Sequence, residues 1–472
     1  GTPFPKTTGP APRERDGVNK MNPNTSAIDA HIQANLERSL SEISTLCAQP
    51  SVSARGEGVR ECSAIVEDLF KRYGLRTQIV ETGGQPVVLG FLEGASPRRL
   101  MCYNHYDVQP PEPLDKWTTP PFQPTIRDDA LYARGARDDK GEIVCRLAAI
   151  DAVRAAYDGK LPCSIIMVAE GEEEIGSPHM KEFVQQNLAL LRCDGAIWEE
   201  GGTDETGRHR MPLGARGILA VELSVETMAR DAHSGGAHIL PSAAWRLVRA
   251  LNTLKDADER ILIDGFYERA WPPSDLDRQL LALQPDPTEL LRAETGAKAF
   301  LGGMSGPALN KAVFNPTCTI EGITTGYQGA GFKTVIPARA SAKLDFRLVM
   351  DQNPEDIFAK LRRHLDAQGF EDVKAEWLGA MWPTKAAPDN PLVVLATRAA
   401  EEVYGKPSSL IPTAGGSSPI YAFSRPLNIA VITAGIGNMQ NRQHAPDEFV
   451  RIADFVNGTR HVARIMEGFA GL

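Results

Sequence analysis

The chain has 472 residues, of which 42% are hydrophobic and 24% charged, and its formal net charge is −9. This length exceeds what one hydrophobic core usually supports, so we expect two domains. The negative charge and the scattered basic residues argue against nucleic acid or an anionic membrane as a partner. No apolar run reaches the length of a membrane span, which argues against an integral membrane protein.

The cysteines and the N-terminal residues bear on the compartment. The seven cysteines are widely spaced without a Cys-x-x-Cys pair, and several lie in apolar runs, which favours buried thiols in a reducing compartment. Residues 1–20 are rich in Pro, Gly, Thr and basic residues, and we interpret them as a tag or vector remnant before a natural start at Met21. With no apolar signal segment we expect a cytoplasmic protein, unless a tag has replaced a signal.

The first elements are helical and then strand-like. Apolar residues recur at three- and four-residue steps over 26–48, which predicts an amphipathic helix. A second helix is predicted over 58–73, where Gly74 ends it. Strand-like runs follow at 77–80, 86–92 and 99–103.

A proline-dense loop over 109–128 separates these strands from an alternating series, and so long an irregular segment is usually functional. The series comprises a helix at 140–157, a strand at 164–169, a helix after Pro178 and a strand at 195–198. Such alternation predicts an α/β fold with a doubly wound, mostly parallel sheet. Ligands of such sheets gather at the carboxyl ends of strands, which is where His105, Glu170 and Glu199 lie.

From about residue 213 the pattern changes to that of an α+β domain. Residues 217–226 alternate apolar and polar side chains, as a half-buried antiparallel strand does. Further elements are predicted at 239–254, 317–322, 341–348, 354–367, 390–404, 428–433 and 448–468. We expect residues 213–384 to form a smaller domain inserted into a catalytic domain of residues 21–212 and 385–472.

Four separated clusters carry the chemistry of this chain. They are Asn104-His105-Tyr106-Asp107, Arg134-Gly135-Ala136-Arg137-Asp138-Asp139-Lys140-Gly141, Glu170-Gly171-Glu172-Glu173-Glu174 and Gln443-His444-Ala445-Pro446-Asp447-Glu448. Together they supply two imidazoles and enough carboxylates for two closely spaced cations, with one acid left over as a base. This inventory predicts hydrolysis at a dinuclear metal centre.

Taken one at a time, the clusters can be interpreted either as metal-binding groups or in simpler structural terms. His105 and Asp107 lie two apart at a strand end and so share a face, as two ligands of one ion would. The second cluster could be a mixed-charge helix start capped by Asp, and the third a solvated acidic turn. Carboxylates as close as those of the third cluster raise one another's pKa unless cations neutralise them. One Glu binding metal beside a neighbour that acts as general base would explain them.

In this order the motifs His-Tyr-Asp-Val-Gln-Pro, Arg-Gly-Ala-Arg-Asp-Asp-Lys-Gly, Glu-Gly-Glu-Glu-Glu-Ile-Gly-Ser and His-Ala-Pro-Asp-Glu resemble those of the M20 metallopeptidases. This family includes carnosinase-like dipeptidases, aminoacylases, glutamate carboxypeptidases and succinyl-diaminopimelate desuccinylases. The resemblance extends from about residue 28 to the end. It implies that His105, Asp138 and Glu199 bind one metal ion, and that Asp138 bridges to a second ion held by Glu174 and His444. Glu200, the neighbour of Glu199, is the alternative ligand.

The same resemblance assigns roles around the metals. Asp107 would orient His105 instead of binding metal, because a ligating imidazole commonly donates its other N–H to a carboxylate. Glu173 would be the general base. The family also implies a cis peptide bond between Asp138 and Asp139.

Substrate contacts are implied as well. The inserted domain would mediate a homodimer, and His233 would stabilise the oxyanion in the partner's active site. Arg347 would receive a substrate carboxylate, which suits bidentate recognition. Thr334, Gly416 and Ser417 resemble further substrate contacts.

The stretch Lys-Thr-Val-Ile-Pro at 333–337 and the chain length favour the carnosinase-like dipeptidase branch. We therefore expect a metal-dependent hydrolase of dipeptides, with an N-acyl amino acid deacylase as the alternative on the same scaffold. A non-catalytic protein is disfavoured, because the base and all five ligand positions are filled. A His and carboxylate set without Cys suits Zn²⁺ and tolerates Mn²⁺ or Co²⁺.

Overall fold

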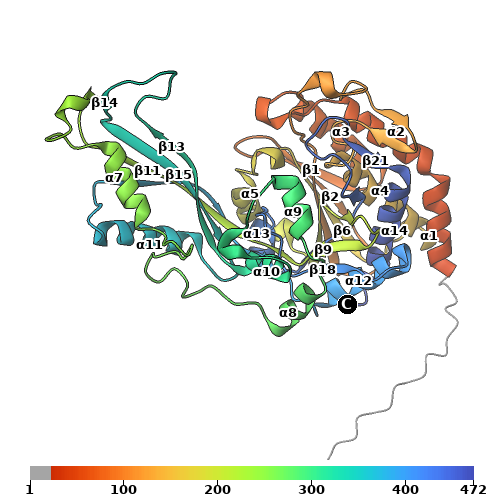
Figure 1. Ribbon diagram of the computed structural model, residues 1–472. Helices are drawn as coiled ribbons and strands as arrows, with labels where there is room; N and C mark the ends of the chain where they lie inside the picture. The colour runs from red at the N-terminus through yellow and green to blue at the C-terminus, as the bar shows by residue number, and fades with distance from the viewer. Residues whose placement is uncertain (1–22) are drawn as a thin grey trace, which may run out of the picture.

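The structure is a computed structural model that describes residues 23–472, so the expected tag at 1–20 lies outside the described residues. Figure 1 shows two lobes, a larger one that contains both ends of the described chain and a smaller one beside it. Helices and strands mix in both, and the expected α/β class is confirmed.

The larger lobe is built on a six-stranded sheet with the order β1-β2-β6-β3-β7-β19. Its strands are β1 (Arg76–Val80), β2 (Val87–Leu92), β3 (Arg99–His105), β6 (Ser164–Glu170), β7 (Gly195–Trp198) and β19 (Val431–Thr433). The four strands from β6 to β19 run parallel, while β1 and β2 are antiparallel neighbours at one edge. Consecutive residues of β3 and β6 are almost all buried, as expected of strands covered on both faces.

Helices pack on both faces of this sheet. One face is covered by α1 (Pro23–Ala34), α2 (Leu36–Ala48), α3 (Val59–Arg72), α4 (Lys140–Ala156), α12 (Pro391–Tyr404) and α14 (Ile452–Phe469). The other face is covered by α5 (Met180–Gln186), α6 (Leu188–Leu191) and α13 (Tyr421–Leu427). Helix α4 lies between the sheet and α14, so nearly all its positions are buried. It therefore holds the loop that precedes it firmly in place.

The smaller lobe has its own sheet and core. Its antiparallel strands, in the order β13-β15-β11-β16, are β11 (Gly217–Glu226), β13 (Thr317–Thr325), β15 (Arg339–Leu348) and β16 (Lys374–Met381). Helices α7 (Ala243–Asn252) and α11 (Pro354–Ala367) pack against it. Side chains of β11 alternate between buried and half-buried, which is the alternation that the sequence predicts.

The chain passes between the lobes twice, and the two passages lie side by side. Here β10 (Gly214–Ala215) pairs with β17 (Thr384–Lys385) in antiparallel register. The intervening helices α8 (Asp275–Ala282), α9 (Thr288–Thr295) and α10 (Pro307–Lys311) lie near this junction in Figure 1. Lys385 and Asp277 form an ion pair there, which ties α8 to the junction.

Three small sheets complete the described chain. They contain β4 (Thr125–Arg127), β5 (Ala130–Tyr132) and β21 (Phe449–Arg451); β8 (Gly202–Thr203), β9 (His209–Pro212), β18 (Ser409–Ile411) and β20 (Gly437–Asn438); and β12 (Ala232–His233) with β14 (Val335–Ile336). The first two support the loops of the larger lobe, and the third lies in the smaller lobe.

Two predicted helices need correction. The single helix expected over 26–48 is two helices separated at Asn35, whose side chain donates to the His31 carbonyl oxygen at 2.9 Å. The C-terminal helix begins at Ile452 instead of 448, because residues 449–451 pair with β5 as strand β21. At 449–451 cross-strand pairing replaces the helical hydrogen bonds, whereas at Asn35 the backbone leaves helical dihedral angles, with φ −105° and ψ 12°.

Candidate metal centre

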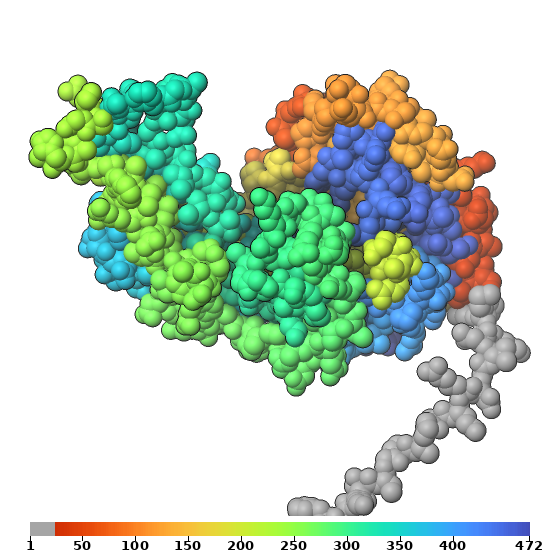
Figure 2. Space-filling model, in the orientation of Figure 1, coloured from red at the N-terminus to blue at the C-terminus, as the bar shows by residue number. Residues whose placement is uncertain are grey.

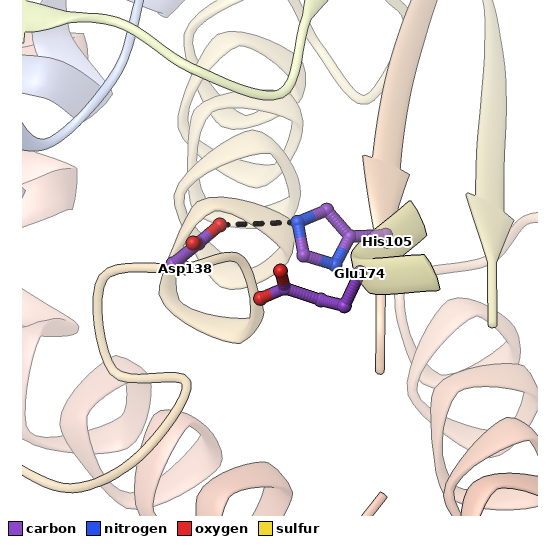
Figure 3. Close-up of side chains that lie close together, drawn as sticks. All are labelled: His105, Asp138 and Glu174. Carbon is purple, nitrogen blue, oxygen red and sulfur yellow. Dashed lines mark hydrogen bonds and ion pairs between the residues drawn. The ribbon is translucent and has the colours of Figure 1, made fainter. Parts of the chain in front are cut away.

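Three predicted ligands meet at the carboxyl edge of the main sheet. His105 ends β3, Asp138 lies in the loop before α4, and Glu174 lies in a 3-10 turn directly after β6. One ligand atom from each lies within 4.8 Å of the others, and the Nε2 atom of His105 is 3.1 Å from Oδ1 of Asp138. In Figure 3 the carboxylate of Glu174 points to the space between the other two side chains.

His444 joins this cluster from the loop between β20 and β21. Its Nε2 atom is 2.9 Å from Oδ2 of Asp138 and 3.2 Å from Oε2 of Glu174. These two hydrogen bonds raise the pKa of the imidazole to about 10. The two oxygens of the Asp138 carboxylate thus contact two different imidazoles. A carboxylate that bridges two cations needs this geometry.

Asp107 is buried beside His105 and has three partners. Its carboxylate accepts the backbone N–H groups of Glu173 and Glu174 at 3.2 and 3.0 Å, and Oδ1 is 3.4 Å from Nδ1 of His105. The backbone carbonyl oxygen of Asp107 lies closer still to Nδ1 of His105, at 3.0 Å, so the backbone and side chain of this one residue hold the imidazole while its carboxylate holds the acidic turn. This arrangement suits the orienting role that the family resemblance implies better than the direct ligand role first expected from spacing.

Two buried carboxylates, those of Asp139 and Glu448, hold the loop that carries Asp138. The peptide bond between Asp138 and Asp139 is cis, as expected. Asp139 accepts from the side-chain amide of Asn104 at 2.7 Å and from the backbone N–H of His105 at 3.0 Å. This contact connects the loop to the end of β3.

Glu448 is the second of these carboxylates. It accepts the backbone N–H groups of Gly135, Arg137 and Asp138 at 3.0–3.1 Å, and the guanidinium of Arg134 at 2.6 Å. It is fully buried. Four donors on one carboxylate satisfy it completely and fix the backbone from Arg134 to Asp138.

Glu173 and Glu199 are two carboxylates of the cluster whose pKa values are raised. Burial raises the pKa of Glu173 to about 7, and its acidic neighbours add to the effect. Burial also raises the pKa of Glu199 well above its ordinary value. Oε1 of Glu199 accepts from the Trp198 indole at 2.9 Å, but Oε2 is buried without a hydrogen-bond partner among residues 23–472. Glu200, the alternative ligand, is exposed and contacts Gln443 at 3.2 Å.

Two features of this cluster indicate whether a cation fits: the unpartnered Oε2 of Glu199 and the excess of carboxylates. A buried carboxylate oxygen without a donor is costly unless a cation completes it. Imidazole nitrogens and carboxylate oxygens are donors that zinc, manganese and cobalt accept. The residues present therefore fit a divalent metal centre.

A cavity of about 270 Å³ opens beside these carboxylates. Its lining includes Glu173, Glu199, Gly416 and Ser417, so two predicted substrate contacts share it with the acidic cluster. Arg347, at the end of β15, donates from Nη1 to Oγ of Ser417 at 3.0 Å. The junction of the lobes thus brings a guanidinium to the rim of the acidic site.

His233 and Thr334 lie elsewhere. Both are exposed at the β12–β14 pair in the smaller lobe, where the Ser234 N–H donates to the Thr334 carbonyl oxygen at 3.1 Å. Neither lines the cavity beside Glu173. Within one chain they belong to a different surface from the acidic cluster.

Three residues at the site have contacts that the sequence analysis did not anticipate. The Gln109 side chain donates to Glu174 at 2.8 Å, and the Gln443 side chain to Asp138 at 2.7 Å. Glu448 supports the loop as described above. Gln443 and Glu448 lie inside the fourth cluster and Gln109 lies two residues after the first. Their positions in the sequence could therefore have indicated a role at the site, whereas their amide or acid chemistry alone could not.

Comparisons with known proteins show the family to which this chain belongs. Residues 101–468 match the peptidase family M20/M25/M40. The M20 family metallo-carboxypeptidase Sso-CP2 from Sulfolobus solfataricus superposes with a TM-score of 0.85 at 33% identity, covering 92% of this chain and 99% of that one. The Cys-Gly metallodipeptidase DUG1 of Saccharomyces cerevisiae is 28% identical over 82% of each chain. The Beta-Ala-His dipeptidase of Homo sapiens is 28% identical over 84% of this chain and 82% of its own.

The chain therefore belongs to peptidase family M20/M25/M40, whose members are metal-dependent hydrolases. All seven cysteines are free, and six are buried. Among residues 23–472 no helix is both long and apolar enough to cross a bilayer.

Proposed function

We propose that this protein hydrolyses the amide bond of dipeptides at a pair of divalent metal ions. The observation that carries the proposal is the contact of Asp138 with His105 through one oxygen and His444 through the other. His105 and Glu199 would complete one metal site, and Glu174 and His444 the other. The relatives named dipeptidases support the substrate class.

The chain's own residues would divide the work of catalysis. When bound, the two ions, Zn²⁺ by preference, would polarise the amide carbonyl and make water more acidic. Glu173 would take the proton of the attacking water and return it to the leaving amine. Its burial supports this role, because a pKa near 7 is the value at which a base can both accept and release a proton.

Substrate would lie in the cavity beside Glu173. Arg347 would hold the C-terminal carboxylate, and Ser417, which already accepts from it, would keep the guanidinium in place. Gly416 lines the same cavity and leaves room for the substrate backbone. Thr334 would join from the partner subunit together with His233.

We propose that residues 213–384 form a dimerisation domain. The β10–β17 pair lies at both proposed boundaries and supports them. The outer face of α7 exposes Trp245 by 65% and Val248 by 45%, and β13, an edge strand, exposes Ile320 and Ile323 by almost half. Unpaired edges and apolar patches of this kind are typical of interfaces, and a second copy of the chain would cover them.

Mixing two inactive variants tests the trans role of His233. Glu173→Gln and His233→Ala should each be nearly inactive alone. When the two are unfolded and refolded together, half of the mixed dimers' sites contain neither defect, so activity should reappear. Sedimentation should show dimers throughout. Absence of recovery in verified mixed dimers would contradict the trans role and leave the base assignment intact.

A substrate panel tests the reaction itself. The metal-loaded protein would be offered free dipeptides and N-acyl amino acids with the same C-terminal residue, and product release measured. Cleavage confined to free dipeptides supports the dipeptidase. Preference for the acylated set would identify the alternative, an N-acyl amino acid deacylase with the same metal and base residues. Cleavage of neither set would contradict the proposal.

A further inference from the structure

A second cavity of about 280 Å³ adjoins the catalytic one. Glu200, Pro212 and Thr433 line both, so the two cavities meet around these residues. The walls of the second cavity come from β8, β9 and β20 and from the segment that leads to His444. The proposed reaction gives this second cavity no role.

The charge of its walls is strongly positive. Three arginines, Arg137, Arg210 and Arg442, face a single carboxylate, Glu200. Arg210 is exposed and has no side-chain hydrogen bond or ion pair in the described chain. Arg442 approaches Asp447 only at 3.7 Å. In a protein with a net charge of −9, a cavity whose walls bring together three guanidinium groups and one carboxylate is suited to an anion.

Arg137 is the residue that distinguishes this cavity from a basic surface patch. It is only 7% exposed, yet its guanidinium makes no hydrogen bond or ion pair with any residue of 23–472, and Nη1 is buried without a partner. A buried guanidinium in this state is costly, and buried charges are normally paired. The backbone of Arg137 is fixed by Glu448, so the side chain cannot easily leave.

The neighbouring chain leaves space for this guanidinium. A Cβ atom on Gly437 would lie 2.8 Å from Nη2 and 3.0 Å from Nε of Arg137. The carboxylates of Glu200, Asp138, Glu142 and Asp139 stabilise the charge of Arg137 at longer range and raise its pKa. None of the described residues, however, brings a carboxylate within 4.0 Å of the guanidinium, so these charges leave Nη1 without a hydrogen-bond acceptor. The unpartnered nitrogen lies at a cavity whose chemistry suits an anion.

We propose that the arginine-lined cavity is an anion-binding subsite that receives a carboxylate or phosphate group. Planar guanidinium groups bind such groups in bidentate fashion. Because the cavity adjoins the catalytic one, the anion would be a second acidic group of the substrate, additional to the carboxylate assigned to Arg347. The inference about the substrate therefore rests on the proposed function, while the inference about the subsite does not.

The first experiment compares matched substrates. Dipeptides containing Asp or Glu, at either position, would be paired with the same peptides containing Asn or Gln. A charge-assisted contact contributes about 1.5–3 kcal/mol, so the acidic member should be preferred about 10-fold or more in kcat/KM. Arg137→Gln and Arg210→Gln should reduce this preference towards one, mainly through KM. Arg398→Gln, which removes an exposed charge on α12, is the matched control and should keep it.

The second experiment measures binding directly. Inorganic phosphate would be titrated calorimetrically into the metal-loaded wild type, Arg210→Gln and Arg398→Gln proteins. Arg210 is exposed, so its variant should fold even if that of Arg137 does not. Phosphate bound by wild type and Arg398→Gln, but at least about 10-fold more weakly by Arg210→Gln, supports the subsite.

The two experiments separate the possible outcomes. Acidic preference lost in the arginine variants identifies the anion as part of the substrate. Arginine-dependent phosphate binding without acidic preference supports the subsite and identifies a free anion as its ligand. If no amide is cleaved, the proposed function fails, and phosphate binding still decides on the subsite. Equal phosphate binding by all three proteins together with no acidic preference would overturn the proposal.

Discussion

Glu173 shows how strongly a residue's role depends on its immediate surroundings. It is one of four glutamates in five residues, and of these four it is the one that lines the cavity beside Glu199. Glu173→Gln should lower kcat by about 10²–10⁴-fold, because proton transfer is lost while shape is kept. Metal content, measured by atomic emission, should stay at the wild-type value. A variant that remains active would show that Glu173 is not the base.

We expect Glu448 to affect metal affinity as strongly as a metal ligand does, although its carboxylate is not one of the proposed ligands. Glu448→Gln removes a charge from four donors and leaves Arg134 unpaired, so we expect a loss of about 3 kcal/mol or more in the free energy of unfolding. The backbone at Asp138 should loosen, and metal retained after dialysis should fall.

The neighbouring variant Asp447→Asn is the control for Glu448. Asp447 contacts Thr118 and Arg127 rather than the Asp138 loop. Its substitution should leave metal retention close to that of the wild type. Equal loss of metal in both variants would show a general effect of destabilisation.

At the scale of the element, the start of α4 depends on one glycine. A Cβ on Gly141 would lie 2.0 Å from the carbonyl oxygen of Ala136, so helix and loop approach too closely for any side chain. Gly141→Ala should cost about 1–3 kcal/mol, as overpacking does, and should weaken metal binding by displacing the loop. Urea denaturation and metal titration would measure both effects.

Gly379→Ala in β16 is the matched control for Gly141→Ala. A Cβ there meets nothing within 4 Å, so Gly379→Ala should leave the urea midpoint and metal affinity close to the wild-type values. If Gly141→Ala were equally harmless, the close approach at the start of α4 would not be a constraint on the loop.

At the scale of the whole molecule, two buried histidines connect elements far apart in sequence and should make stability depend on pH. His209 on β9 and His461 on α14 lie with ring centroids 4.6 Å apart. Burial lowers the pKa of His209 from 6.5 to about 4, and that of His461 well below its ordinary value. Both rings are therefore neutral in the folded protein at neutral pH.

The direction of the pH effect on stability follows from the difference between the pKa of these imidazoles in the folded protein and in the unfolded chain. Between pH 6.5 and 4 the unfolded chain binds protons that the folded chain excludes, so stability present above pH 6.5 is lost as pH falls. His209 alone accounts for about 3 kcal/mol across that interval. Urea denaturation of the wild type and His209→Gln at pH 7.5, 6 and 5 should show a shallower decline in the variant. Parallel declines would contradict the assignment.

The sequence by itself determined the class of fold, most elements and the residues that lie together at the candidate metal centre. These features follow from local pattern: apolar periodicity sets helices and strands, and the ends of parallel strands gather at one edge. The prediction failed where long-range pairing competes with a helical pattern, as at β21, and was silent on the short, proline-separated helices α8 to α10.

Only the tertiary structure decided which polar groups have hydrogen-bond partners and which do not. Glu448 meets the loop at Arg134 to Asp138 from more than 300 residues away, and Gln443 reaches Asp138 across a similar separation. Nor does any local pattern reveal that Arg137 is buried without a partner while Arg134, three residues earlier, is paired. Hydrogen-bond satisfaction depends on atoms that distant segments bring into contact, and residue order along the chain does not contain that information directly.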